Sequence, residues 1–308
     1  MKKVRHLLTI RDLTAQEIQH LFQEAARLKK SKARTQPLRG KTLGLMFQKP
    51  SVRTKVSFEA GMNQLGGQTL YMGPVELEQG KRESAKDLAR VLSRYLDGIV
   101  ARTFGHQDVV EMAQWATIPV INGLSDESHP CQALADLFTI SEKLGKLRGV
   151  QVAYIGDGNN VCHSLIEASA LTGVHLAIAT PPGYEPKTEV VRWAQAQARK
   201  TGSRITLTQN AREAVQKAAI VYTDVWTSMG QEKERQGRQQ IFRDFQVNRS
   251  LMQQAAKGAR FMHCLPAHRG EEVSDDLMDS TQAIVYDQAE NRLHVQKAIL
   301  LMLLRKTK

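Results

Sequence analysis

Cysteine is scarce in this chain, since only three of its 308 residues are cysteines. Cys131, Cys162 and Cys264 are odd in number, and no two of them have the Cys-x-x-Cys spacing of a structural zinc site. This pattern argues against a disulfide framework and against a structural zinc site, and no metal is expected. The simplest prediction from this cysteine usage is a protein of a reducing compartment, the cytoplasm.

Long hydrophobic runs are also absent. The longest apolar run, Ala298 to Leu304, is far shorter than the roughly twenty residues that a membrane-spanning helix needs. The basic start, Met1 to Arg5, is not followed by the apolar core of a signal peptide. The sequence therefore predicts a cytoplasmic protein without a membrane partner.

Aromatic residues make up only 6% of the chain, and 43 basic residues outnumber 31 acidic ones, for a net charge of +12. A basic chain can be a nucleic-acid-binding protein, which is the non-enzymatic alternative. The basic residues are scattered, however, from Lys29 and Lys30 through Lys81 and Arg82 to Arg305, and no aromatic residues alternate with them to stack on bases. We therefore expect no nucleic-acid partner, and a positive surface that attracts an anionic substrate.

Helix and strand signals alternate along the chain, which is typical of parallel α/β sheets. The length suggests two domains, each large enough to bury its own core. We predict an α/β fold with two doubly wound parallel-sheet domains linked by interdomain helices. The predicted strands are Leu43 to Phe47, Gln68 to Tyr71, Gly98 to Ala101 and Pro119 to Ile121 in the first half, and Val152 to Ile155, His175 to Ala179, Arg204 to Leu207, Ile220 to Thr223, Arg260 to His263 and Ala283 to Tyr286 in the second.

Three helices are marked clearly. Thr14 and Glu17 form a capping box that opens the first helix. Pro130 suits the first turn of another helix, which ends near the stretch Gly145 to Gly149, interpreted as the seam between the domains. A final helical pattern, Asn291 to Leu304, is so rich in Leu, Ile and Met that it must pack against other elements.

The segment His263-Cys264-Leu265-Pro266-Ala267-His268-Arg269-Gly270 places a thiol, two imidazoles and a guanidinium after a short apolar strand. The residues alone allow a nucleophilic Cys/His pair, a metal site, or polar groups that position a substrate. Adjacent residues of an extended chain point to opposite sides, so His263 and Cys264 cannot act together as base and nucleophile without help from elsewhere. Taken alone, Cys264 could also be a small buried hydrophobic residue.

A second polar segment follows the strand that ends at Phe47. Ser51 and Thr54 offer hydroxyls there and Arg53 offers a guanidinium, where a helix begins. The first backbone N–H groups of that helix would point the same way, so the segment predicts a phosphate-binding cradle. The alternative is an ordinary N-cap followed by a solvated Arg53 and Lys55.

Gly156 and Gly158 form a Gly-x-Gly turn after a predicted strand, a pattern that also occurs in dinucleotide-binding folds. Val161 stands where the third glycine would be, and the next strand, His175 to Ala179, does not end in an acidic residue. We therefore expect no nucleotide, and no cofactor of any other kind.

Together these segments resemble the aspartate/ornithine carbamoyltransferase family over nearly the whole chain. The family's phosphate loop, Ser-Thr-Arg-Thr-Arg, is matched by Ser51-Val52-Arg53-Thr54-Lys55. Arg102 to His106 resembles the family's arginine segment, and His129-Pro130-Cys131-Gln132 its His-Pro-x-x-Gln motif. The segments that resemble the ornithine branch in particular are Gly156 to Asn160, Asp224 to Gly230 and His263 to Pro266.

The resemblance implies transfer of a carbamoyl group from carbamoyl phosphate to the δ-amine of L-ornithine, giving L-citrulline and phosphate in arginine metabolism. It implies a carbamoyl phosphate-binding domain of residues 1–143 and 288–308 and an ornithine-binding domain of residues 144–287. It also implies a homo-oligomer, a trimer or a multiple of one. A related amine such as putrescine or acetylornithine is the alternative acceptor.

The resemblance further assigns residues to each substrate. The expected catalytic residues are Arg102, His129, Asp224 and Cys264, of which Cys264 orients the amine instead of attacking. The residues expected to bind carbamoyl phosphate are Ser51, Val52, Arg53, Thr54, Arg102, His129, Gln132, Cys264, Leu265 and Arg292. Those expected to bind ornithine are Asn160, Asp224, Ser228 and Met229, whereas Asn159 and His163 are interpreted as local structure.

Three positions depart from the family pattern. Val52 replaces the usual Thr and lacks its hydroxyl, and Lys55 replaces an Arg whose bidentate contacts a lysine cannot reproduce. Glu78 stands where many relatives have a Gln that reaches the carbamoyl phosphate of a neighbouring subunit. Since a carboxylate would repel phosphate, we expect either that Gln79 substitutes or that Glu78 turns away.

Overall fold

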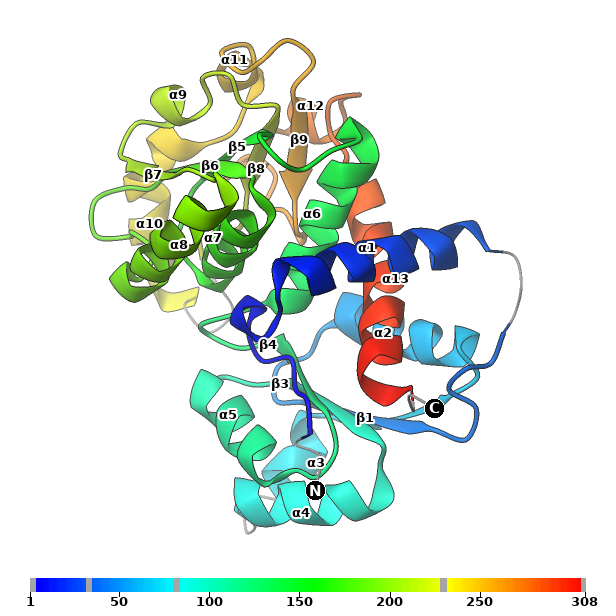
Figure 1. Cartoon of the computed structure of the whole chain (residues 1–308). Helices are drawn as coiled ribbons and strands as arrows, with labels where there is room; N and C mark the ends of the chain where they lie inside the picture. The colour runs from blue at the N-terminus through cyan, green and yellow to red at the C-terminus, as the bar shows by residue number, and fades with distance from the viewer. Residues whose placement is uncertain (1–3, 32–34, 80–83, 228–231, 306–308) are drawn as a thin grey trace. The chain divides into compact units, whose positions relative to one another are not determined.

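We describe the chain from a computed structural model, shown in Figure 1. The described residues are 4–31, 35–79, 84–227 and 232–305, without the side chains of residues 78, 79 and 232. The chain forms two compact units, one of residues 1–134 and 292–308 and the other of residues 135–291. The division into a carbamoyl phosphate-binding and an ornithine-binding domain stays a prediction.

The first unit holds a parallel sheet with strand order β2-β1-β3-β4. The two central strands are almost entirely buried, as expected of a parallel sheet covered on both faces, whereas the edge strand β2 is partly exposed. The strands are β1 (Thr42–Phe47), β2 (Gln68–Met72), β3 (Gly98–Arg102) and β4 (Val120–Leu124). The helical elements are η1 (Ile10–Asp12), α1 (Ala15–Lys30), α2 (Val52–Gln64), α3 (Pro74–Gln79), α4 (Ala85–Tyr95) and α5 (His106–Trp115), together with the start of α6 (Pro130–Leu144) and the end of α13 (Val285–Leu304).

Helices α4 and α5 pack against each other and share one hydrophobic cluster with the sheet. Leu92 of α4 and Met112 of α5 lie in this cluster with Met46 of β1 and Ile99 of β3. Because burial of each such side chain contributes roughly 1.5–3 kcal/mol, the cluster fixes the strands whose ends carry the candidate site residues.

The second unit holds another parallel sheet, with strand order β7-β6-β5-β8-β9. Its strands are β5 (Gln151–Ile155), β6 (His175–Ala179), β7 (Ile205–Thr208), β8 (Ile220–Thr223) and β9 (Arg260–His263). Its further helical elements are α7 (Asn160–Thr172), α8 (Thr188–Thr201), α9 (Ala211–Ala214), η3 (Glu232–Glu234), α10 (Arg235–Ile241), η4 (Arg243–Phe245), α11 (Arg249–Met252) and α12 (Asp275–Met278). No helix among the described residues has both the length and the apolar character needed to cross a membrane.

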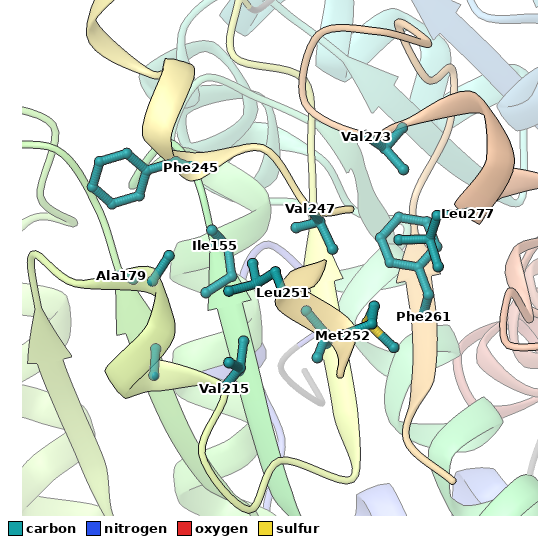
Figure 2. Packing of buried hydrophobic residues seen from close by; sticks show 14 of the residues in the cluster. Ile155, Ala179, Val215, Phe245, Val247, Leu251, Met252, Phe261, Val273 and Leu277 are labelled. Carbon is teal, nitrogen blue, oxygen red and sulfur yellow. The ribbon is translucent and has the colours of Figure 1, made fainter. Parts of the chain in front are cut away.

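Figure 2 shows the main core of this second unit. Ile155 of β5 and Phe261 of β9 meet Val215, Val247 and Leu251 from the segments that cover one face of the sheet. These side chains are all nearly or fully buried. The packing holds the ends of β5, β8 and β9 in fixed positions.

The predicted α/β fold with two parallel-sheet domains is confirmed, and most predicted strands are observed nearly in place. One predicted strand, Ala283 to Tyr286, is wrong. Ala283 forms only an isolated bridge with Phe261, and α13 begins at Val285, before the predicted start at Asn291. The β-branched residues suggested a strand, but Asp287 in the first turn favours a helix start, and packing outweighs the weak strand preference.

Each sheet changes its direction of strand order once. In the first unit the chain moves from β1 outward to β2 and then from β3 outward to β4, so the switch lies between β1 and β3. In the second unit it lies between β5 and β8. Open α/β sheets bind ligands outside the carboxyl ends of the strands at such switch points. The structure therefore directs attention to residues after β1 and β3, and after β5 and β8.

Candidate active site

In the first unit, the N-terminus of α2 lies at the switch point. Ser51 is the N-cap of α2, and its Oγ accepts a hydrogen bond from the Thr54 backbone N–H (3.3 Å) and donates one to Thr54 Oγ1 (3.2 Å). The segment is thus an N-cap, as one sequence interpretation held. It also gathers two hydroxyls at a helix N-terminus, where backbone N–H groups favour anions. The cap geometry is therefore compatible with the predicted phosphate cradle.

Guanidinium groups concentrate around this helix end. Arg102 is buried at the end of β3, and its Nε has no hydrogen-bond partner among the described residues. Burial, and then the positive charges of Arg292 and Arg53, lower the pKa of Arg102 to about 10. Like charges held together in a folded chain are unfavourable unless an anion offsets them, and such perturbed groups mark candidate functional sites.

The start of α6 contributes two more predicted residues. Burial, and then the charges of Arg292 and Arg102, lower the pKa of His129 well below 6.5, so its imidazole is neutral at neutral pH. Arg292 on α13 donates through Nη1 to Gln132 Oε1 and through Nη2 to Thr54 Oγ1 (3.3 Å). A single guanidinium thus joins α2, α6 and α13, and the structure brings these predicted residues together.

The departures from the family pattern have distinct outcomes. The Val52 side chain is 79% exposed. Lys55 Nζ lies 4.0 Å from the centroid of the Tyr71 ring, a cation–π contact that takes the ammonium towards β2. The side chains of Glu78 and Gln79, on which the two alternatives depended, lie outside the described residues.

In the second unit, Asp224 follows β8 and its carboxylate accepts three hydrogen bonds. The donors are Asn159 Nδ2 to Oδ2, the Val225 backbone N–H to Oδ1, and Cys264 Sγ to Oδ1, each at 2.8 Å. Asp224 is buried, with 6% of its surface exposed. Donors from three segments therefore fix the orientation of one carboxylate at the β5/β8 switch point.

The Cys264 thiol is protonated at neutral pH. Its burial, and then the nearby Asp224 charge, raise its pKa well above 9. The thiolate is the nucleophilic form of cysteine, and a carboxylate neighbour does not generate it. The neighbouring His263 does not act on Cys264 either, because its Nδ1 accepts from the Leu265 N–H (2.8 Å) and its Nε2 faces Glu272 Oε1 (3.1 Å). The geometry disfavours a nucleophilic Cys/His pair.

Several supporting residues escaped the sequence analysis. Glu272 is fully buried and holds His263, which in turn holds Leu265 in the left-handed region at φ 60°, uncommon for a residue other than glycine. Arg238 donates to Asp157 Oδ2 (3.0 Å), and burial raises the pKa of Asp157 to about 6 although Arg238 opposes the shift. For Glu272, the sequence signal that could have been used is the pair of carboxylates, Glu271 and Glu272, directly after Gly270.

Asn159 is more than local structure. Its Oδ1 caps α7 by accepting from the N–H groups of Val161 (3.0 Å) and Cys162 (3.1 Å), as predicted, while its Nδ2 contacts Asp224. Asn160, the predicted ornithine ligand, begins α7 and is partly buried beside it. Ser228 and Met229 lie outside the described residues.

The Gly-x-Gly turn has a structural explanation. A Cβ at Gly158 would lie 2.3 Å from the Pro186 backbone nitrogen, and the Gly158 N–H donates to Tyr184 O (2.9 Å). The glycine is needed for close approach to a neighbouring backbone segment, so the turn requires no pyrophosphate to account for it.

Among the residues of the second unit that the structure describes, two groups of side chains have metal-ligand chemistry. Asp224, His263 and Cys264 offer atoms within 4.8 Å of one another. In this group both ring nitrogens of His263 and the Cys264 sulfur already have protein partners. The other group is His268, Glu271 and Glu272.

Comparison with known proteins covers almost the whole chain. Residues 5–142 match the model of the aspartate/ornithine carbamoyltransferase carbamoyl-P binding domain, and residues 148–303 match that of the Asp/Orn binding domain. Among relatives, the chain is 52% identical over 305 residues to a protein named ornithine carbamoyltransferase from Pyrococcus horikoshii, covering 98% of this chain and 96% of the relative. A protein of the same name from Anoxybacillus flavithermus is 52% identical over 98% of this chain and 97% of its own length.

Solved structures agree. The ornithine carbamoyltransferase from Pyrococcus furiosus superposes with a TM-score of 0.96 at 51% identity, covering 99% of this chain and 98% of that one. The corresponding structure from Gloeobacter violaceus has a TM-score of 0.90 at 43% identity, covering 99% of this chain and 100% of that one.

Proposed function

This chain belongs to the aspartate/ornithine carbamoyltransferase family, as its motifs predicted, and we propose that it transfers the carbamoyl group of carbamoyl phosphate to the δ-amine of L-ornithine. The observation that carries the proposal is the cluster of Arg53, Arg102 and Arg292 at the N-terminus of α2. This cluster offers charge and donors to a doubly charged phosphate in the domain whose family model is named for carbamoyl-P binding.

In the proposed reaction, the amine nitrogen attacks the carbonyl carbon, the bond from that carbon to the phosphate oxygen breaks, and phosphate leaves. Ser51, Arg53, Thr54 and the first N–H groups of α2, including that of Val52, hold the phosphate. Arg102 and neutral His129 donate to the carbonyl oxygen as it gains negative charge. Gln132, oriented by Arg292, accepts from the carbamoyl NH2.

On the acceptor side, we assign the δ-amine to the Asp224 carboxylate. Asp224 carries the charge that attracts a cationic amine, and its three hydrogen bonds fix the direction in which it presents its remaining lone pairs. Cys264 orients this carboxylate. As the family motif predicts, we also assign Cys264 and Leu265 to the binding of carbamoyl phosphate. Asn160, Ser228 and Met229 are assigned to the amino-acid end of ornithine. The ammonium gives one proton to solvent before its nitrogen attacks, because only the neutral nitrogen has a free lone pair. The second proton that this nitrogen loses after attack leaves with the phosphate.

We also propose that copies of this chain associate, as a trimer or a multiple of one. Apolar side chains are exposed near the edge strand β2, where a soluble monomer would expose polar ones. They are Val52 (79%) and Val56 (53%) on α2, Leu70 (51%) on β2, and Val75 (66%) on α3. A second copy seated there would cover them beside the phosphate cradle. The three free cysteines agree with the cytoplasmic location proposed from the sequence.

A citrulline colour assay with carbamoyl phosphate and ornithine, acetylornithine, putrescine or aspartate tests the function. We expect ornithine to be used most efficiently, without added metal or nucleotide, consistent with a role in arginine metabolism. Arg53→Ala should cripple turnover, whereas Arg94→Ala, which removes an exposed arginine of α4, should not. Higher efficiency with putrescine or acetylornithine would assign the chain to the alternative acceptor, and activity with none would refute the proposal.

A further inference from the structure

The loop after Cys264 folds back on itself so that three potential metal ligands meet. Gly270 adopts φ 86°, its N–H donates to Val273 O (2.8 Å), and the Glu271 N–H donates to His268 O (2.9 Å). This turn places His268, Glu271 and Glu272 with one ligand atom each within 4.8 Å of one another.

Two atoms in this group lack protein partners. Glu272 Oε2 belongs to a fully buried side chain and His268 Nδ1 to one that is 37% exposed, and neither atom has a hydrogen-bond partner among the described residues. They lie 3.9 Å apart, too far for a direct hydrogen bond. Two ligands each about 2.0–2.2 Å from a shared metal ion lie about this far apart when the angle between them is wide.

The surrounding charges leave the Glu272 carboxylate only partly compensated. Its Oε1 accepts from His263 Nε2 and from the His268 backbone N–H. The adjacent Arg269 is directed elsewhere, because it forms two hydrogen bonds with Asp279 (2.6 and 2.8 Å). A buried carboxylate oxygen without a donor is unfavourable, and a bound cation removes that cost.

Glu271 is the third potential ligand, and its contact with Arg235 limits the affinity of the site for a metal ion. Its Oε1 pairs with Arg235, so a metal must share this carboxylate with a guanidinium. A carboxylate has two oxygens and can serve both. One imidazole and two carboxylates suit zinc and neighbouring divalent transition metals, whereas magnesium and calcium favour oxygen alone.

We propose that His268, Glu271 and Glu272 form a binding site for a divalent transition-metal ion such as Zn²⁺, separate from the atoms assigned to either substrate. Glu272 then has two partners, because its Oε1 accepts a hydrogen bond from His263 and its Oε2 binds the ion. Through Glu272, the ion is connected to His263 at the end of β9. The ion has no part in the proposed carbamoyl transfer.

The test uses the full chain without a polyhistidine tag, stripped with a chelator and titrated with Zn²⁺ by calorimetry and with Co²⁺ by absorption spectroscopy. We expect one ion per chain. His268→Ala should weaken binding about tenfold or more, since losing even an outer-shell partner typically costs 10–100-fold. Glu271→Gln should also weaken binding. His20→Ala, which removes an exposed imidazole of α1, should leave it unchanged.

Cobalt distinguishes this site from the group of Asp224, His263 and Cys264. Binding through His268 and the two carboxylates gives no sulfur-to-cobalt charge-transfer absorption, and Cys264→Ser leaves the affinity unchanged. A strong charge-transfer band that disappears in Cys264→Ser would place the ion at the other group and overturn the proposal. Absence of binding would overturn it too. The wild-type spectrum decides between these outcomes even if a variant fails to fold.

Discussion

The Cys264 thiol donates a hydrogen bond to Asp224 Oδ1 at 2.8 Å, which joins the end of β9 to the end of β8. The direction of this bond matters, because the thiol is the donor and the carboxylate is the acceptor. Asp224 is thereby available to a cationic amine, and Cys264 acts through the carboxylate. This pair separates an orienting role for the cysteine from a covalent one.

Replacing Cys264 tests that role. In Cys264→Ser a hydroxyl still donates to Asp224, so we expect turnover within about tenfold of wild type, equivalent to about 1.4 kcal/mol. Cys264→Ala removes the donor and should be more damaging, mainly through a higher KM for ornithine. Mass spectrometry after incubation with carbamoyl phosphate alone should find no carbamoylated Cys264. A mass increment there, with an inactive Ser variant, would establish covalent transfer instead.

Asp224→Asn replaces the charged acceptor by a neutral amide. The amide cannot attract a cationic amine. Because Asn159 donates to Oδ2 whereas Val225 and Cys264 donate to Oδ1, the NH2 group of the amide faces a donor in either orientation. Because hydrogen bonds to charged groups contribute about 1.5–3 kcal/mol, we expect kcat/KM for ornithine to fall roughly ten- to hundredfold.

Carbamoyl phosphate binding, measured by calorimetry, should change little in Asp224→Asn. Norvaline, which keeps the α-groups of ornithine but lacks the δ-amine, should still compete with ornithine. If the variant loses affinity for both substrates equally, Asp224 supports the fold of the site and does not bind the amine.

Arg102→Met should separate activity from stability. Loss of the donor to the developing oxyanion should lower kcat about a hundredfold or more. The same change removes a buried charge that repels Arg292 and Arg53, so the free protein should melt a few degrees higher, at about 2–4 °C per kcal/mol for a domain of this size. The exposed Arg94→Met should alter neither quantity. A destabilised Arg102→Met would show that the arginine supports the fold.

Asp157 predicts a pH dependence of stability. Burial raises its folded-state pKa from 3.8 to about 6, so the folded chain binds this proton more tightly than the unfolded chain. The contribution of Asp157 to the free energy of unfolding therefore falls as pH rises from about 4 to 6 and is constant above that range. Between about pH 4 and 6, the free energy of unfolding of Asp157→Asn should rise relative to that of wild type by on the order of 1–3 kcal/mol.

Denaturant unfolding at several pH values measures this difference. Asp244→Asn, which changes an exposed carboxylate in the same unit, is the matched control. Its plot of the free energy of unfolding against pH should run parallel to that of wild type. If the Asp157→Asn curve also runs parallel to wild type, the carboxyl titrates without the predicted shift.

The sequence by itself determined the fold class and the family. The alternation of strand and helix signals predicted both sheets because backbone propensity and hydrophobic period are local properties. Ser51, Arg53 and Thr54 were predicted to form a phosphate cradle from their types and spacing at a helix start. The helix start is observed, and the phosphate cradle stays a prediction. The one wrong strand, Ala283 to Tyr286, lies where β-branched residues favour a strand locally, whereas packing makes Val285 the start of a long helix.

Tertiary structure alone decided how the side chains act on one another. The low pKa of His129 arises from burial beside Arg292 and Arg102, which are far from it in sequence. Glu272 is important because the turn at Gly270 brings it back to His263 and His268. Burial, charge proximity and hydrogen-bond direction depend on distances across the fold, which spacing along a chain does not encode, and these distances decide that Cys264 donates to Asp224.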